Sequence, residues 1–251
     1  MNLSTLRILL LAATAITTAR AGWMEEVARN TDSTVEVGFV SQPVMRGRTP
    51  DVGTTALLVA DASLSVPGGL GLNLSLHASA MQSFDASPRL DQRYVSLDIQ
   101  RHSELGYVAI GFGFVQQLGI NPATTAAIER EAEVTLTYVH LLESNLSLSA
   151  DVRWIAVRQE LQTEIGLSYT KALNADYSVS FSPVVGATHA ADNLGGNLGV
   201  VDGFSYIGGT VYLMVGLGNA YTLNIQGGVQ VRSEGPNRTA GQGGISVSRS
   251  F

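Results

Sequence analysis

Histidine is the side chain in this sequence best suited to acid–base chemistry or to holding a metal ion. The sequence has four of them: His77, His102, His140 and His189. No two have the spacing of a metal motif such as H-E-x-x-H, and there is no Cys to complete a site. We therefore expect these histidines to be ordinary polar side chains, and the sequence predicts neither a metal nor a cofactor.

Two of the histidines lie near serines, which leaves a hydrolase as one alternative. The pairs are His77 with Ser75 and Ser79, and His140 with Ser144 and Ser147. A Ser nucleophile needs a base within about 3 Å and a third residue that orients that base. In a chain this rich in Ser such neighbours are expected by chance, and no G-x-S-x-G motif is present.

Composition restricts the class of protein. Of 251 residues, 45% are apolar and only 14% are charged, with 27 Gly and no Cys. A disordered chain would be less apolar and more charged, and the absence of Cys excludes a disulfide scaffold. The net charge of −6 argues against a nucleic-acid partner. Soluble domains average about 25% charged residues, so this chain has little material for a water-facing surface.

Residues 1–21 have the layout of a secretory signal peptide. Arg7 precedes the apolar run of residues 8–16, and Ala19 and Ala21 are the small residues that a signal peptidase reads. We expect cleavage after Ala21, a short periplasmic segment over residues 22–32, and one domain over residues 33–251.

Beyond residue 32, apolar and polar residues alternate, which is typical of strands with one apolar face. Residues 72–79 and 146–154 show the pattern clearly. The polar phase carries ten candidate lumen-lining residues: Glu36, Asn73, Asp98, Glu133, Asp151, Arg153, Glu164, Asn224, Gln226 and Gln230. Arg or Lys at the bilayer midplane costs about 2–4 kcal/mol, so charges should face inward. We expect Asp151 and Arg153 to form part of a charge ladder there.

Turn signals divide this region into about twelve strands. They are expected over 33–46, 54–66, 69–80, 92–102, 106–117, 129–141, 145–157, 160–172, 175–187, 203–215, 220–232 and 241–251. Links after even-numbered strands are short and the others are longer, except near residues 158–160. This predicts an all-β protein, an antiparallel transmembrane β-barrel with short periplasmic turns and longer outer loops. It should be closed, because an open sheet edge in hydrocarbon leaves backbone groups unpaired.

Glycines inside the expected strands should permit bends and close packing. They are Gly111, Gly113, Gly227, Gly228, Gly243 and Gly244. The C-terminus continues the pattern, since Phe251 is in phase with Ile245 and Val247. A terminal Phe on an alternating strand resembles the signal that the bacterial barrel assembly machinery reads, although Arg249 stands where an apolar or aromatic residue is usual.

One stretch resembles a known family. Ser33-Thr-Val-Glu-Val-Gly-Phe-Val-Ser41 runs into Arg46-Gly47 and then into a strand of small and apolar residues, 55–63. This is similar to the opening of the TorF-type porins of bacterial outer membranes, with Pro43 where the family usually has an aromatic residue. The resemblance implies a location and an architecture more than a solute. Arg46 and Arg48 lie at the mouth of the first long loop, where they could position an anionic solute or loop carboxylates.

The sequence thus predicts a bacterial outer-membrane porin that passes small polar solutes or ions through a narrow lumen. Acidic residues outnumber basic ones on the expected lumen face, which favours cations. The partners are outer-membrane lipid, the barrel assembly machinery and small polar solutes, and no oligomeric state follows. Two alternatives stay open: a non-conducting structural or surface-binding barrel, and an outer-membrane hydrolase.

Overall fold

The computed structural model describes residues 31–41, 54–66, 71–84, 89–120, 127–156, 160–190, 205–233 and 239–251. The expected signal peptide and the loop-mouth residues Arg46 and Arg48 lie outside these ranges. Among the described residues, no helix is long and apolar enough to cross a membrane.

The described residues form twelve strands, at positions close to those expected. They are β1 (Thr31–Ser41), β2 (Thr54–Ser65), β3 (Leu72–Ser83), β4 (Arg89–Ser103), β5 (Gly106–Ile120), β6 (Ala127–Glu143), β7 (Leu146–Ile155), β8 (Glu160–Ala172), β9 (Tyr177–Ala190), β10 (Ser205–Gly218), β11 (Tyr221–Arg232) and β12 (Thr239–Ser250). The first strand was expected to reach residue 46; β1 ends at Ser41, and residues 42–46 lie outside the described part.

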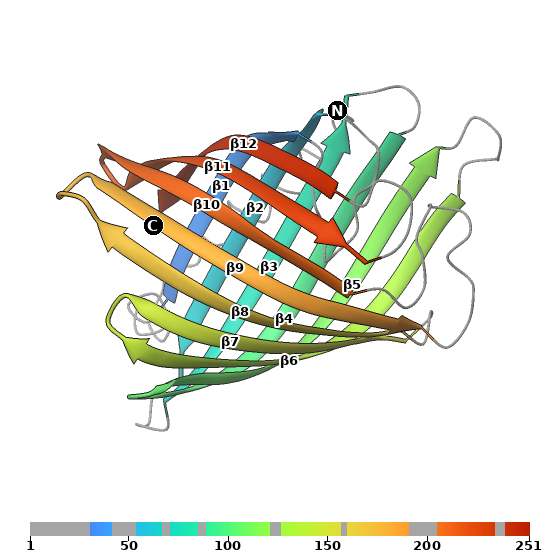
Figure 1. Cartoon of the computed structure of the whole chain (residues 1–251), viewed down its shortest axis with the longest axis horizontal. Coiled ribbons are helices and arrows are strands. Elements are labelled where there is room, and N and C mark those ends of the chain that lie inside the picture. The colour runs from blue at the N-terminus through green and yellow to red at the C-terminus, as the bar shows by residue number, and fades with distance from the viewer. Residues whose placement is uncertain are drawn as a thin grey trace, which may run out of the picture.

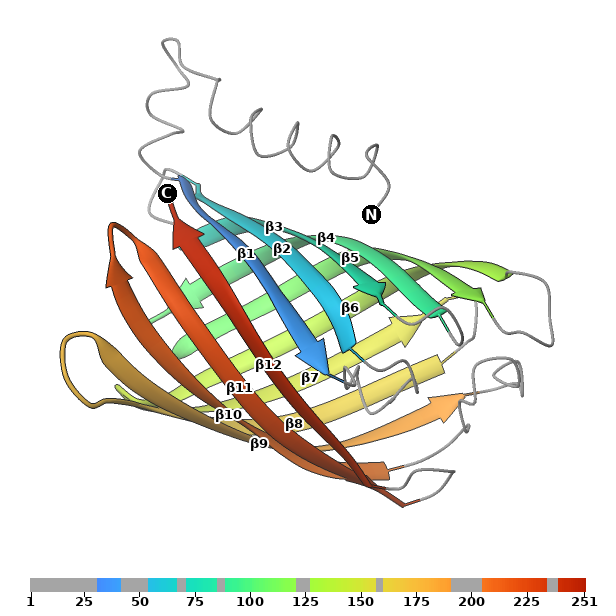
Figure 2. The same ribbon diagram turned by 90° about the horizontal axis from the view of Figure 1, so that it is seen from above.

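Every strand pairs antiparallel with its neighbour in sequence, and β1 pairs with β12, so the sheet is closed. Figure 1 shows the tilted strands wrapping around the barrel, and Figure 2 shows β1 (blue) beside β12 (red). The expected all-β, closed, antiparallel barrel is confirmed.

Link lengths alternate only in part as expected. At one end of the barrel, the short-turn end, strands are joined by residues 66–71, 104–105, 144–145, 173–176 and 219–220, which are links of two to six residues. At the other end, the long-loop end, the joined strands are separated by residues 42–53, 84–88, 121–126, 156–159, 191–204 and 233–238, which are links of four to fourteen residues. The alternation fails after β2, whose six-residue link is longer than the five-residue link after β3, and after β7 and β8, whose links both have four residues. At the turn after β10, Asn219 and Ala220 have positive φ values of 51° and 63°, as the tightest hairpin turns require.

The outward face is apolar and the inward face is polar. Ile110, Phe112 and Phe114 on β5 are each about half exposed, whereas Gly111, Gly113 and Val115 between them are buried. Exposed apolar side chains recur at every second position around the barrel, as in Val95, Leu97, Ile99, Val134, Leu136, Val152, Trp154, Ile165, Leu167, Val211, Val229 and Ile245. Such a surface is unfavourable in water and fits the hydrocarbon of a bilayer.

We predict that a charge on this outward face destabilises the barrel according to its depth. Ile110 pairs with Ile99 and Leu136 inside the apolar belt, so Ile110→Arg should lower the free energy of unfolding by about 2–4 kcal/mol. Leu105 lies in a short turn and is 65% exposed, so Leu105→Arg should cost about 0–1 kcal/mol. Urea unfolding in lipid vesicles measures both, and equal losses would contradict a membrane-embedded belt.

Candidate functional site

The ten candidate lumen-lining residues all lie on the face opposite the exposed apolar side chains. The strand register decides the face, because residues paired across neighbouring strands point to the same side of the sheet. Thr135 pairs with Gly111 and with Arg153, and Arg153 pairs with Gln162. These four residues therefore share the inward face. The same alternation places the other candidates inward on β1, β3, β4, β6, β7, β8 and β11.

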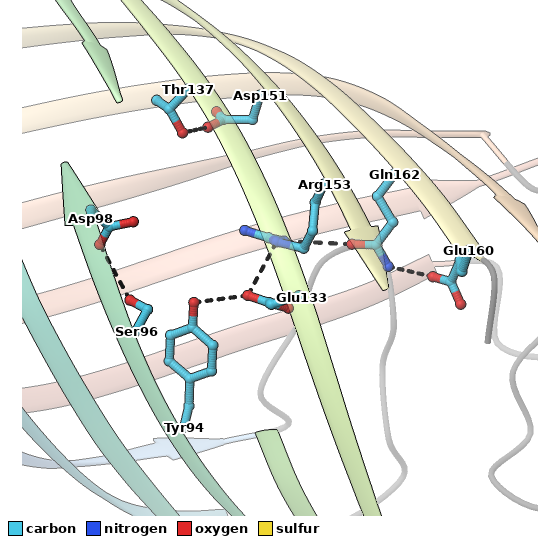
Figure 3. Close-up of polar contacts among 9 residues, drawn as sticks. All are labelled: Tyr94, Ser96, Asp98, Glu133, Thr137, Asp151, Arg153, Glu160 and Gln162. Carbon is cyan, nitrogen blue, oxygen red and sulfur yellow. Dashed lines mark hydrogen bonds and ion pairs between the residues drawn. The ribbon is translucent and has the colours of Figure 1, made fainter. Parts of the chain in front are cut away.

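A group of side chains around Arg153 forms the most connected part of the inward face (Figure 3). Arg153 Nε lies 3.5 Å from Glu133 Oε1, and the Tyr94 hydroxyl donates to the same oxygen at 2.8 Å. Only 1% of the Glu133 side chain is exposed. A buried carboxylate needs a cation or hydrogen-bond donors, and Arg153 and Tyr94 provide both.

The group continues onto β8. Arg153 Nη1 donates to Gln162 Oε1 at 3.5 Å, and Gln162 Nε2 donates to Glu160 Oε1 at 2.5 Å. Glu160, 1% exposed, was not among the sequence candidates. Extending the polar phase of β8 backwards from Glu164 would have found both Gln162 and Glu160. Extending the polar phase of β4 backwards from Asp98 in the same way reaches Ser96 and Tyr94.

Asp151 and Arg153, which we expected to form part of a charge ladder, each contact a residue of an adjacent strand. Asp151 accepts a hydrogen bond from Thr137 Oγ1 at 2.5 Å, and Arg153 turns to Glu133 instead (Figure 3). The two side chains are on the same strand face, but the closest inward neighbours of each come from the adjacent strands. Asp98 differs, because it accepts a hydrogen bond from Ser96 of its own strand, β4, at 3.3 Å.

Four further candidates lie along β8 to β12 and at the closing seam. The Tyr206 hydroxyl on β10 reaches over β9 to donate to Glu164 Oε2 at 2.5 Å. Ser246 donates to Glu36 across the β1–β12 seam. Asn224 Nδ2 donates to Ser248 at 3.3 Å, and Gln226 lies against Gly244.

A cavity of about 470 Å³ opens among these inward residues. It is lined by β1–β4, β6 and β7, with Asp61, His77, Tyr94, Asp98 and Arg153 among the lining residues. His77 Nδ1 donates to Asp61 Oδ1 at 2.6 Å, and the Asp61 side chain is 52% exposed. The carboxylates in this cavity are therefore accessible to a solute.

Burial differs between the two halves of the inward face. Near the long-loop end Glu131, Glu160, Thr188 and Arg232 are each exposed by 7% or less. Towards the short-turn end more of the inward side chains are half-buried or exposed, as at Asp61, although Ala109 and Ser180 are buried. Inward side chains are thus more often buried in the long-loop half of the barrel.

Four of the expected glycines allow side chains to pack against the wall. A Cβ at Gly111 would lie 2.0 Å from Asp98 Oδ1, and one at Gly113 would lie 2.9 Å from the Tyr94 hydroxyl. Gly228 and Gly244 are similarly close to inward amide side chains. The expected close packing is absent at Gly227 and Gly243. A Cβ at Gly227 would meet nothing within 4 Å, and a Cβ at Gly243 would make only ordinary van der Waals contacts.

The four histidines have separate surroundings in the described part of the chain. His77 bonds to Asp61, His102 donates to Gln100 at 3.1 Å, and His140 shares a hydrogen bond with Tyr138 on the outward face. His189 is exposed near the end of β9. Within the described ranges no group of three or more His, Cys, Asp or Glu could hold a metal ion.

Comparison with known proteins supports the architecture. No family model and no curated protein matches the chain. Among solved structures, the translocator domain of the autotransporter NalP from Neisseria meningitidis has a TM-score of 0.55 and 10% identity, covering 99% of this chain and 98% of that one. An outer-membrane channel from Pseudomonas putida F1 has a TM-score of 0.54 and 14% identity, covering 88% and 95%. The KdgM porin has a TM-score of 0.51 and 13% identity, covering 87% and 99%.

The chain therefore has the fold of bacterial outer-membrane β-barrels. These neighbours are porins, a channel and a translocator domain rather than enzymes. At such low identities the likeness extends to the fold, and the function has to be argued from the inward side chains.

We predict that Gly186→Ala separates Tyr206 from Glu164. A Cβ at Gly186 would lie 2.3 Å from Tyr206 Cζ, so the ring must move and the bond to Glu164 must break. Overpacking of this kind typically costs about 1–3 kcal/mol. Gly227→Ala is the matched control, because its Cβ meets nothing within 4 Å. Urea unfolding in vesicles should shift for the first variant only; an unchanged midpoint for Gly186→Ala would contradict the packing described.

Proposed function

We propose that this chain is a narrow passive pore of the bacterial outer membrane that passes small polar solutes and prefers cations. The observation that carries the proposal is the excess of carboxylates on the inward face. Glu36, Asp61, Asp98, Glu131, Glu133, Asp151, Glu160 and Glu164 lie inward on the described strands. The inward arginines there are Arg153 and Arg232.

Acidic walls of this kind raise the local concentration of cations and repel anions. Strand number supports a narrow lumen, since about eight strands can be filled by side chains and 16–18 leave a wide channel. The contacts of Arg153 with Glu133 and Gln162 join β7 to β6 and β8 along the wall, and the cavity of about 470 Å³ lies beside them. The outer-membrane location is supported by the barrel fold, the apolar outward face and the expected signal peptide. The opening residues 33–63 fit a TorF-type porin within that class.

A non-conducting barrel is the second candidate, and burial favours it. Thr188 and Gln230 are exposed by 4% and 6%, although both face inward. A lumen closed at its long-loop half would pass no current, and the protein would then act as a structural or surface-binding barrel.

The experiment that separates these candidates is planar-bilayer recording under a KCl gradient. A pore should give discrete current steps and a reversal potential that favours K⁺. Replacing the accessible carboxylates, Asp61→Asn together with Asp98→Asn, should lower the K⁺ to Cl⁻ permeability ratio about twofold, because less negative charge faces the solute.

Glu104→Gln is the matched control, because it removes a carboxylate from an exposed short turn outside the lumen. It should leave the permeability ratio at the wild-type value. An absence of current steps in wild-type protein would favour the non-conducting barrel, and a preference for Cl⁻ would contradict the charge argument.

The solute preference should differ from that of one structural neighbour. A KdgM porin structure is described as a complex with disordered oligogalacturonate, which is a polyanion. The inward carboxylates of this chain would repel such a chain of acidic sugars. We therefore propose neutral or cationic solutes for this protein.

We also propose that Phe251 is read by the barrel assembly machinery. Its backbone N–H donates to Ser33 O at 2.9 Å and its ring is 56% exposed. The Arg249 guanidinium lies 4.6 Å from the centroid of the same ring and 5.2 Å from that of Tyr221. This cation–π contact gives Arg249 a role on the outward face despite its charge.

Phe251→Ala should accordingly reduce the amount of folded barrel in outer membranes severalfold, measured as the heat-modifiable band on a gel. Phe84→Ala is the control, because it removes another exposed outward ring, 63% exposed, far from the C-terminus. Equal losses for the two variants would indicate a general loss of stability and would contradict recognition of the terminus.

A further inference from the structure

Charge is distributed unevenly around the inward face. The inward carboxylates all lie on β1 to β8. In the described part of β9, β10 and β12 the inward residues are uncharged, and on β11 the single inward charge is Arg232 at the end of the strand. We call β9–β12 the neutral wall and β1–β8 the acidic wall.

The polar side chains of the neutral wall are amides and hydroxyls, and Val184, Met214 and Ala240 are its inward apolar side chains. Its inward polar residues are Ser178, Ser180, Ser182, Thr188, Tyr206, Thr210, Tyr212, Thr222, Asn224, Gln226, Gln230, Gln242, Ser246, Ser248 and Ser250. Each of these groups can donate and accept hydrogen bonds, which is what a sugar hydroxyl also does. Asn224 and Gln226 are half-buried, so a solute in the lumen can reach them.

Two polar atoms of the neutral wall have no hydrogen-bond partner. They are Thr188 Oγ1 and Gln230 Nε2, which belong to side chains at least nine-tenths buried. Buried polar groups in folded proteins are almost always paired. Both atoms lie below the accessible surface of the described wall, so the amides of the neutral wall that a solute can reach are those of the half-buried Asn224 and Gln226.

The neutral wall lies across the lumen from acidic strands. In the ring of twelve strands, β10 stands six places from β4, which carries Asp98. Figures 1 and 2 both show β9–β11 on the side of the barrel opposite β3–β5. The cavity on the acidic side exposes Asp61 and Asp98 beside the Tyr94 ring, and its volume is in the range of small-molecule sites, about 300–1,000 Å³.

We infer that the preferred solute is a hydroxylated amine, specifically an amino sugar carrying a free ammonium group. Its ammonium group would bind Asp61 and Asp98, and its hydroxyl groups would bind the amides opposite. A neutral sugar lacks the charge, and an alkylammonium ion lacks the hydroxyl groups. This inference rests on the proposed pore and gives the solute class that such a pore would favour.

The test measures how strongly three probes block the K⁺ current of the wild-type protein in planar bilayers. The probes are glucosamine, which has both features, glucose, which lacks the charge, and tetraethylammonium, which lacks hydroxyl groups. Glucosamine should bind about tenfold more tightly than either of the others, since each loses hydrogen bonds or charge contacts.

Two double variants test which wall accounts for the block of the K⁺ current by glucosamine. Asp61→Asn with Asp98→Asn should weaken block by glucosamine and tetraethylammonium alike. Asn224→Ala with Gln226→Ala should weaken block by glucosamine about threefold and block by tetraethylammonium much less. Glu104→Gln should match wild type, and heat-modifiability on gels confirms that each variant is folded.

The outcomes distinguish this inference from the proposed function. An absence of current steps would overturn the pore itself. A working, cation-preferring pore in which glucosamine blocks no better than tetraethylammonium would overturn the role of the neutral wall. Equal block by glucosamine and glucose would overturn the role of the carboxylates. The wild-type probe series is decisive even where a variant fails to fold.

Discussion

Closure of the sheet is the constraint on which the rest of this structure depends. Hydrocarbon offers no water to satisfy backbone N–H and C=O groups, so every strand needs two partners. Pairing of β1 with β12 supplies the backbone hydrogen bonds that these two strands would otherwise lack. Thr34 lies opposite Ser250, and the Phe251 N–H donates to Ser33 O. At the other end of the seam, Gly243 N–H donates to Ser41 Oγ. Because the sheet closes, each strand acquires one face towards lipid and one towards the lumen.

The inward face is crowded, and glycine makes that crowding possible. Tyr206 reaches Glu164 only because Gly186, between them, has no side chain. Asp98 lies over Gly111 in the same manner. Polar side chains thus lie along the wall and bond to one another there. The same arrangement stabilises the sheet and limits how far these side chains extend into the lumen.

Charge on the inward face has both a structural and a functional consequence. Glu133 and Glu160 are almost wholly buried, and a carboxylate in such a place is costly unless it is paired. Arg153, Tyr94 and Gln162 supply that pairing. The accessible carboxylates lie elsewhere, at Asp61 and Asp98, and these are the ones that a solute can meet. The carboxylates whose pairing stabilises the wall are therefore different from the accessible ones on which the proposed cation preference rests.

The sequence by itself determined where the strands lie and the face on which each candidate lies, and it determined the alternation of link lengths in part. These follow from local patterns, because a strand repeats every two residues and turns have their own residue preferences. The links after β2 and β7 depart from the alternation. The tertiary structure decided which side chains of different strands bond to one another. Arg153 bonds to Glu133 rather than Asp151, and Glu164 to Tyr206, because register and closure decide which residues of different strands lie side by side. The grouping of uncharged residues on β9–β12 opposite acidic strands likewise exists only once the ring is closed.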